Sequence, residues 1–454
     1  MGQAEEAVNI GHSEAEVFLR AHPQTEAVDA FILDVNGHAT GKRISAIELK
    51  QLAQTGVQFS ASALLADARG LGHNAGGLGG DDGDPDASGW PMPGTLVPVP
   101  WAKRPTAQVQ LQMRDVNTQE LLWWDPRVLL DQVVQRCRAD GLHPVVACEL
   151  EFFLVEPQSG QKPGAALTPA TLSSRPHTAA NLSVQAIEEH AELLGAMRDA
   201  ALAQRLPVAS AVAEYGIGQF EINLTHIADP LLAADQAALL RRAVQGVALA
   251  RGLEATFMPK PFLDQPGNGL HIHVSLTDAA ETNRFGQAGG ELLLNQAIAG
   301  LQIFTGDSIA LFAPHFNSHR RFYGPFVPRT TSWGHNNRSV AFRVPVAPPS
   351  ARRIEHRVAG ADSSPHLVMA AVLAAMHFGI TENRSATAAS QGRVSESLPE
   401  FTAGLLDALR RLEGSALLAR YFPARYLKAY ATLKRGEYNA MMNQLLPAEI
   451  NFYR

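Results

Sequence analysis

Paired carboxylates on strand-like segments constrain this chain more than any other feature of its sequence. The segment 145–155 is apolar except at Glu149 and Glu151, and residues two apart on a β-strand point to the same face. A Glu-x-Glu pair is most often an exposed strand face. Here the apolar residues on both sides predict a central strand instead. Both carboxylates then need partners, because buried like charges are strongly unfavourable without a cation.

Three later segments add carboxylates and imidazoles of the same kind. Glu214 and Glu221 flank a turn with two glycines, whose backbone freedom lets both carboxylates reach one place. His271 and His273 alternate on another strand-like segment, and Glu355 stands in a Glu-His-Arg sequence. Histidines in such a pair are either hydrogen-bonded core residues or zinc ligands of a hydrolase. Five glutamates beside them favour harder ions, and oxygen ligands with an occasional nitrogen suit two Mg²⁺ or Mn²⁺ ions.

The composition excludes several classes of protein. At 454 residues the chain is long enough for about two or three domains. Its net charge of −6 gives no electrostatic reason to bind nucleic acid. No apolar run approaches the roughly 20 residues that span a membrane, and the polar N-terminus is unlike a signal or transit peptide. With two cysteines, we expect a cytoplasmic protein without a disulfide framework.

The first 115 residues have the pattern of a small β-rich unit. Residues 28–44 predict a hairpin with an Asn36-Gly37 turn. The range 70–94 is dense in Gly, Asp and Pro and predicts a long loop. Residues 109–113 alternate like a strand.

The remainder alternates helices with strands, which predicts an α/β catalytic unit and an α+β protein overall. Asp125-Pro126 and Asp229-Pro230 each provide a good N-cap and first helical residue. A single amphipathic helix is expected over Ser183–Leu206. Further helices are expected over Glu291–Phe312, Pro365–Ile380 and Pro399–Arg411.

Taken in this order, the carboxylate and histidine motifs resemble the glutamine synthetase family, and the resemblance covers almost the whole chain. The sequence is most similar to the branch of γ-glutamyl-polyamine or γ-glutamyl-amine synthetases, which the stretch 91–101 also resembles. The resemblance implies a β-grasp-like N-terminal domain over residues 1–115. It implies a glutamine-synthetase-type catalytic domain over residues 116–454.

The resemblance also implies a role for each motif residue. One metal ion would be bound by Glu151, Glu214 and Glu221. The other would be bound by Glu149, His271 and Glu355. Glutamate would be bound by Arg321, Arg357 and Gly267. The transferring phosphoryl group would be met by Arg338 and Arg343, and the nucleotide by His273, Ser275 and Arg353. Glu214 is in addition the candidate base for the amine.

The implied activity is ATP-dependent ligation of L-glutamate to an amine through a γ-glutamyl phosphate. A carboxylate oxygen must first become a leaving group, and transfer of the ATP γ-phosphoryl group achieves this. Two alternatives stay open at this point, a true glutamine synthetase and a non-catalytic structural or regulatory homologue. The family also implies a homo-oligomer, a dodecamer of two stacked hexameric rings, in which the N-terminal unit of one subunit completes its neighbour's site.

Two departures from the ammonia-using enzymes favour a larger amine. Those enzymes carry an aspartate where this chain has Ser60, and a glutamate in a flap that here, over residues 322–329, contains no acid. An ammonium pocket without its anions binds ammonium poorly. The second amino group of a polyamine would need an acidic partner, for which the sequence offers only the loop around Asp82 and Asp84. The composition of that loop favours a solvated, flexible connector, so an apolar or aromatic monoamine is a competing substrate.

Overall fold

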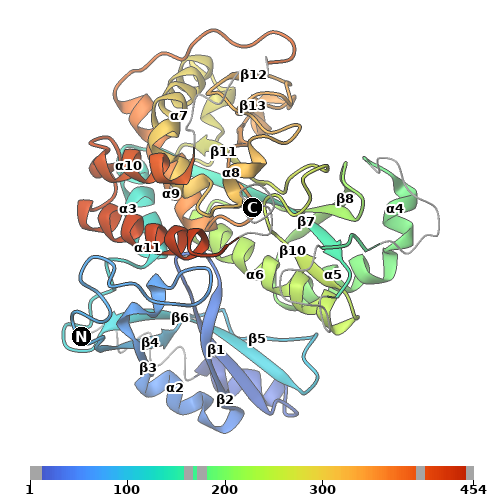
Figure 1. Ribbon diagram of the computed structural model, residues 1–454, viewed down its shortest axis with the longest axis vertical. Coiled ribbons are helices and arrows are strands. Elements are labelled where there is room, and N and C mark those ends of the chain that lie inside the picture. The colour runs from blue at the N-terminus through green and yellow to red at the C-terminus, as the bar shows by residue number, and fades with distance from the viewer. Residues whose placement is uncertain (1–12, 158–166, 171–180, 395–403, 446–454) are drawn as a thin grey trace.

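The computed structural model describes residues 13–157, 167–170, 181–394 and 404–445. They form two β-sheets with helices packed against them, one sheet from the N-terminal quarter of the chain and one from the remainder (Figure 1). The predicted α+β architecture is confirmed. The domain boundary after residue 115 stays a prediction, although the last strand of the first sheet ends at Asp115.

The N-terminal sheet has the strand order β2-β1-β6-β4-β3, and β5 also pairs with β6. The inner pair of β1 and β6 is parallel, and the other pairs are antiparallel. The elements are β1 (Ala27–Leu33), β2 (Ala39–Ser45), η1 (Ala46–Glu48), α2 (Leu49–Thr55), β3 (Val57–Ser60), η2 (Ala61–Leu65), β4 (Asp86–Pro91), β5 (Val97–Pro98) and β6 (Thr106–Asp115). The expected loop over 70–94 was therefore too long, because β4 is recruited by pairing with β3 and β6.

The hairpin between β1 and β2 is present, but its turn differs from the Asn-Gly turn that we expected. The two strands pair up to either side of residues 34–38. Within this loop the Asp34 carboxylate accepts hydrogen bonds from the backbone N–H groups of Asn36 (2.9 Å) and His38 (2.8 Å). An aspartate side chain that bonds to the following backbone closes such a loop without a two-residue turn.

The second sheet has the order β12-β13-β14-β11-β7-β9-β8, with β10 paired to β7. All pairs are antiparallel except β12 with β13. Its strands are β7 (His143–Val155), β8 (Val208–Ala213), β9 (Gln219–Leu224), β10 (Glu254–Thr256), β11 (Leu270–Thr277), β12 (Trp333–His335), β13 (Phe342–Val344) and β14 (Ile354–His356). The 13-residue β7 lies between β11 and β9 and thus at the centre of the sheet, as its apolar flanks predicted.

The other described elements of this part of the chain are helices and short 3₁₀ turns. They are α3 (Pro126–Ala139), α4 (Val184–Glu189), α5 (Ala191–Ala203), α6 (Pro230–Ala250), α7 (Gly290–Phe312), α8 (Ser318–Arg321), α9 (Pro365–Thr381), α10 (Leu405–Gly414) and α11 (Ala424–Met442), with 3₁₀ turns η3 (Arg284–Gly286), η4 (Pro349–Ala351) and η5 (Leu418–Arg420). Helices α7 and α9 approach so closely that a Cβ at Gly300 would collide with the carbonyl oxygen of Ala375. In the described part of the chain, no helix is both long and apolar enough to cross a membrane.

Most predicted helices are present with small shifts at their ends. The expected helix over Ser183–Leu206 is divided into α4 and α5, because His190 leaves the helical conformation (φ −110°, ψ 15°) and its ring packs against Phe220. The helix expected over Pro399–Arg411 begins at Leu405, and residues 395–403 lie outside the described residues.

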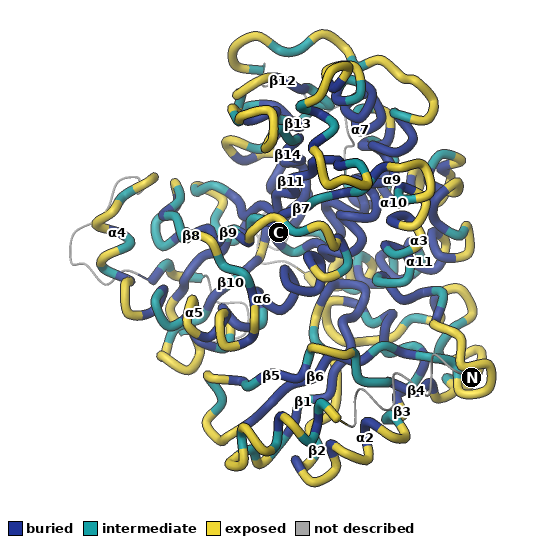
Figure 2. Tube along the Cα trace, turned by 180° about the vertical axis from the view of Figure 1, so that it is seen from behind, coloured by how far each residue is buried: buried dark blue, intermediate teal, exposed yellow. Residues whose placement is uncertain are grey.

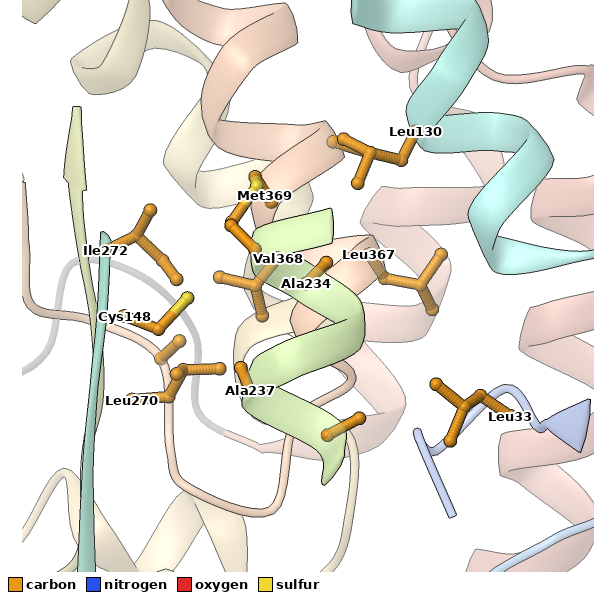
Figure 3. Packing of buried hydrophobic residues seen from close by; sticks show 14 of the residues in the cluster. Leu33, Leu130, Cys148, Ala234, Ala237, Leu270, Ile272, Leu367, Val368 and Met369 are labelled. Carbon is orange, nitrogen blue, oxygen red and sulfur yellow. The ribbon is translucent and has the colours of Figure 1, made fainter. Parts of the chain in front are cut away.

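The two faces of the second sheet have opposite character. Cys148, Leu270 and Ile272 point toward α6 and α9, where they pack in the hydrophobic core (Figure 3). Buried positions run along β6, β7 and β11 (dark blue in Figure 2). Because side chains alternate along a strand, Glu149 and His271 must point to the other face. The core therefore fixes the side of the sheet on which the charged residues gather.

Helix α6 allows a test of the predicted helix starts. The Asp229 carboxylate accepts hydrogen bonds from the N–H groups of Leu231 and Leu232, both at 3.1 Å. We expect Asp229→Ala to lower the free energy of unfolding by about 1 kcal/mol, since two helix donors lose their acceptor. Urea unfolding measures the change. Asp229→Asn, which keeps an acceptor, should retain most of the stability, and equal losses in both variants would contradict a capping role.

A buried lysine connects α11 to the first sheet. Lys434 is 0% exposed, and its Nζ donates to Asn36 Oδ1 (2.7 Å) and to Glu437 Oε2 (3.3 Å). Glu437 also lies 2.5 Å from Nδ1 of His315 and accepts a hydrogen bond from the backbone N–H of Ala68. A buried charge is tolerated only when it is paired in this way, so this cluster holds the N-terminal unit in one position against the rest of the chain.

Candidate active site

The register of the second sheet places the charged residues opposite one another. On β7, Glu149 pairs with His271 of β11, and Glu151 pairs with Glu221 of β9. Directly opposed residues of antiparallel strands share a face, and their Cβ atoms lie about 4.5–5.5 Å apart. Three strands thus bring partners that are 122 and 70 positions apart in the sequence into one cluster.

Glu355 extends this cluster across two further strands. It pairs with His273 of β11 and with Arg343 of β13. Its carboxylate accepts hydrogen bonds from Nη1 of Arg343 (2.8 Å) and Nη1 of Arg357 (2.5 Å). Burial opposes ionisation of Glu355, but Arg357 and the nearby imidazoles outweigh burial and hold its pKa at about 2.

One candidate metal group is the set that the sequence assigned to the second ion. The ligand atoms of Glu149, His271 and Glu355 all lie within 4.8 Å of one another. Nδ1 of His271 lies 3.3 Å from Oε2 of Glu149 and 3.9 Å from Oε1 of Glu355. Two oxygens and one nitrogen form a donor set suited to a hard divalent ion.

The other group differs in one member from the expected set. Ligand atoms of Glu151, Glu221 and His271 lie within 4.8 Å of one another, whereas Glu214 lines the same cavity but is not part of that group. Glu214 follows β8 and is placed by the tight turn that leads into β9. Its role as a ligand stays a prediction.

The electrostatics of this cluster favour a bound cation. Burial and the Glu151 carboxylate raise the pKa of Glu214 to about 7. Burial, Glu149 and the neighbouring carboxylates raise the pKa of Glu221 to about 9. Like charges this close disfavour full ionisation unless positive charge compensates them. The residues present therefore fit a site for divalent metal ions.

Three arginines in the same cavity have an unused donor. Nε of Arg321, Arg343 and Arg357 is buried and has no hydrogen-bond partner among the described residues. Nη1 of Arg321 donates to the backbone oxygen of Val358 (2.8 Å), which fixes its position. A buried donor without a partner costs about 1–3 kcal/mol, and an anionic ligand would supply the missing acceptors.

The loop at Gly267 lies against one of these arginines. A Cβ at Gly267 would collide with the carbonyl oxygen of Pro259 and with the Arg321 side chain, so only glycine fits. The Gly267 carbonyl accepts a hydrogen bond from Nε2 of Gln219 (3.1 Å), which also donates to Asn268 Oδ1 (3.0 Å). Sequence reasoning missed Gln219 and Asn268. Both are polar residues at the start of a strand-like segment, and this pattern could have identified them.

The residues expected at the nucleotide are less closely grouped. Nε of Arg353 donates to Nδ1 of His273 (3.1 Å), and Nε2 of His273 lies 2.7 Å from Oε1 of Glu149. Arg338 is exposed and lines the cavity. Ser275 is buried on β11 but does not line it, so its role stays a prediction without geometric support.

Apart from Ser275, the predicted site residues line one cavity of about 970 Å³. Of the residues singled out in the sequence, the lining includes Glu149, Glu151, Glu214, Glu221, Gly267, His271, His273, Arg321, Arg338, Arg343, Arg353, Glu355 and Arg357. Residues 124–453 match the family model for the glutamine synthetase catalytic domain. The chain belongs to the glutamine synthetase family.

Several named proteins are similar to this chain over nearly its whole length. Gamma-glutamylputrescine synthetase PuuA of Escherichia coli strain K12 is 37% identical over 434 residues, 93% of this chain and 90% of that protein. Glutamate–isopropylamine ligase of a Pseudomonas species is 30% identical over 421 residues, 89% and 90% of the two chains. The solved structure of a GmaS/ADP complex has a TM-score of 0.81 at 25% identity and covers 96% of this chain and 98% of that one. The predicted family is confirmed.

The acidic loop considered as the partner of a polyamine does not line this cavity. Ser60, Asp82 and Asp84 are not among the lining residues. Within the loop, Oδ1 of Asp82 accepts hydrogen bonds from the backbone N–H groups of Gly79 and Asp84, both at 2.9 Å.

Proposed function

We propose that this protein joins the γ-carboxylate of L-glutamate to a primary amine at the expense of ATP. The products are a γ-glutamylamide, ADP and phosphate. One observation carries this proposal. Two groups of candidate metal ligands line the same cavity as three arginines whose buried Nε atoms have no hydrogen-bond partner among the described residues. The names of two relatives, a γ-glutamylputrescine synthetase and a glutamate–isopropylamine ligase, support the same reaction class.

In the first step, a γ-carboxylate oxygen of glutamate attacks the γ-phosphorus of ATP, and ADP leaves with the bridging oxygen. Arg321, Arg357 and the backbone at Gly267 hold the glutamate. Arg338 and Arg343 stabilise the charge that develops on the equatorial phosphoryl oxygens. His273, Ser275 and Arg353 are assigned to the nucleotide.

In the second step, the amine nitrogen attacks the carbonyl carbon of the acyl phosphate, and the C–O bond to phosphate breaks. The nitrogen must lose a proton as the amide forms. We assign this proton to the Glu214 carboxylate, which lines the cavity.

Two Mg²⁺ or Mn²⁺ ions fit the carboxylate and imidazole donors. The proposed ligands are Glu151, Glu214 and Glu221 for one ion, with His271 near enough to contribute, and Glu149, His271 and Glu355 for the other. Bound divalent ions would offset the repulsion between the glutamate carboxylate and the ATP oxygens.

We propose the predicted dodecamer of two stacked hexameric rings as the assembly, with residues 1–115 and 116–454 as the two domains of each subunit in the cytoplasm. The position of Ser60 and of the acidic loop outside their own chain's cavity agrees with a role in a neighbouring site. Light scattering tests this proposal, and a fully active monomer would refute it.

A panel of nucleophiles tests the function. With glutamate and ATP, we expect alkylamines to give phosphate and the γ-glutamylamide mass, with kcat/KM for the best amine about tenfold or more above that for ammonium. Burying even two methylenes accounts for such a ratio. Preference for ammonium would establish a true glutamine synthetase. Absence of phosphate release with every nucleophile would leave a non-catalytic homologue.

A further inference from the structure

One buried glutamine connects two loops of the cavity that carry different functional groups. Gln219 is the first residue of β9, is 2% exposed and lines the cavity. Its Oε1 accepts a hydrogen bond from the N–H of Gly216 (3.0 Å). Its Nε2 donates to the carbonyl oxygen of Gly267 (3.1 Å) and to Oδ1 of Asn268 (3.0 Å). Both hydrogens of the amide are therefore used in bonds to the second loop.

The first loop is the turn between β8 and β9, which carries the proposed base Glu214. The N–H of Glu214 donates to the carbonyl oxygen of Gln219 (2.9 Å), and the N–H of Gln219 donates to that of Gly216 (3.0 Å). A Cβ at Gly216 would collide with the ring of Phe153 and with Oε1 of Gln219. Gln219 thus holds this turn through both its backbone and its side chain.

The second loop, residues 265–269, lies against groups assigned to glutamate and to a metal ion. A Cβ at Gly267 would be 2.9 Å from Cγ of Arg321, and the N–H of Gly269 donates to Oε2 of Glu151 (2.6 Å). A displacement of this loop would therefore move the backbone at Gly267, which is assigned to the glutamate substrate.

A further hydrogen bond joins the same two loops. The N–H of Ile217 donates to Oε1 of Gln265 (2.7 Å), and both residues are half-buried. The carbonyl oxygen of Gln265 accepts a hydrogen bond from Nζ of Lys260, which is 4% exposed. Gln219 and Gln265 thus each link one loop to the other, and Gln265 is itself held from behind.

We propose that Gln219 is a positioning residue that makes glutamate binding and the position of the Glu214 carboxylate interdependent. The proposal deepens the ligase function and rests on it. Glutamate bound at Gly267 restrains the second loop, and the Gln219 amide passes this restraint to the turn that carries the base. Coupling between two sites acts in both directions. Loss of the amide should therefore weaken glutamate binding and also misplace the base, and small misplacements of a catalytic group are costly.

The experiment measures KM for glutamate in two variants that break the link. Gln219→Met removes the acceptor for Gly216 and both donated hydrogen bonds, and Gln265→Met removes the acceptor for Ile217. We expect KM for glutamate to rise about tenfold or more in Gln219→Met, because buried polar partners are left unpaired. The rise should be smaller in Gln265→Met, and Gln265→Glu, which keeps an acceptor for Ile217, should restore most of the wild-type value.

A comparison of two nucleophiles tests whether the base is displaced. At neutral pH an alkylamine is almost wholly protonated and must lose a proton before it attacks, whereas hydroxylamine is mostly unprotonated. At saturating glutamate, we expect kcat with propylamine to fall about tenfold in Gln219→Met. The kcat with hydroxylamine should fall by less than about threefold, since the first proton transfer is not needed.

The matched control is Gln204→Met. Gln204 is also a buried glutamine (4% exposed) that donates to a carbonyl oxygen, that of Pro98 (3.0 Å), but it does not line the cavity. We expect the control to keep both kcat values and KM for glutamate. An equal fall in kcat with both nucleophiles in Gln219→Met would indicate a general distortion and would overturn the positioning role. An unchanged KM for glutamate in Gln219→Met would overturn it as well. If that variant does not fold, an unchanged KM in Gln265→Met has the same meaning.

A binding measurement separates failure of this proposal from failure of the ligase function. A wild-type protein that releases no phosphate with either nucleophile is no ligase. Calorimetric titration of glutamate, in the presence of Mg²⁺ and a non-hydrolysable ATP analogue, tests the link without turnover. We expect Gln219→Met to bind glutamate about tenfold more weakly than Gln204→Met does. Equal affinities would overturn the link between the two loops.

Discussion

Glu355→Gln is expected to lower amine-dependent phosphate release on the order of 10²- to 10³-fold. Glu355 accepts hydrogen bonds from two arginines, Arg343 and Arg357, and also belongs to a compact ligand group. The amide keeps the shape of the side chain but removes the charge on which the metal and both guanidinium groups depend. Steady-state kinetics at saturating Mg²⁺ measures the effect.

A second measurement distinguishes loss of a ligand from a general defect. We expect Mn²⁺ titration, followed by electron paramagnetic resonance, to show two tight sites in the wild-type protein and one in Glu355→Gln. The control is Glu291→Gln, which removes the partner of Arg352 at an ion pair outside the cavity and should leave both readouts unchanged. Normal turnover in Glu355→Gln would refute the assignment of the second metal site.

Lys434→Met is expected to lower the free energy of unfolding by about 3–5 kcal/mol. The substitution removes the cationic partner of the buried Glu437 carboxylate and the donor to Asn36 Oδ1, which is the costly way to break such a pair. Denaturant unfolding of the assembled protein measures the loss. Because Lys434 also connects α11 to the first sheet, amide exchange should rise in the loop at residues 34–38 before global unfolding.

The double variant Lys434→Met/Glu437→Leu provides the control. Replacing both charges by apolar groups is often neutral, so we expect most of the lost stability to return. Burial opposes ionisation of Glu437, but the His315 hydrogen bond and the Lys434 charge outweigh it and hold the pKa at about 2, below the ordinary 4.5. This group therefore contributes stability that is complete above pH 4.5 and is lost as the pH falls toward 2. The double variant should lose less unfolding free energy over that pH range than the wild-type protein does. An equal loss in both proteins would contradict the ion pair.

Much of the site could be predicted from local patterns. The period of two on a β-strand placed Glu149 and Glu151 on one face, and the same rule paired His271 with His273. Asp125 and Asp229 marked the starts of α3 and α6, because N-caps act within one turn of their own helix. These patterns depend only on neighbours in the chain, so they can be recognised without knowledge of the fold.

Other features required the tertiary structure. The sequence did not reveal that His271 lies near both carboxylate groups while Glu214 lies outside the compact ones, because that depends on the register between β7, β9 and β11. Nor did it reveal the division of the helix at His190 or the recruitment of residues 86–91 into a strand, which follow from contacts with distant segments.

The sequence by itself determined to which family the chain belongs and which side chains share a strand face, and it predicted the side chains that we propose to carry the chemistry. Only the tertiary structure decided how those faces align, which arginines keep an unused donor, and that Gln219 joins two loops of the cavity. The physical reason is that alternation along a strand is a local property, whereas strand register, burial and hydrogen bonds between loops arise between segments that the chain brings together only on folding.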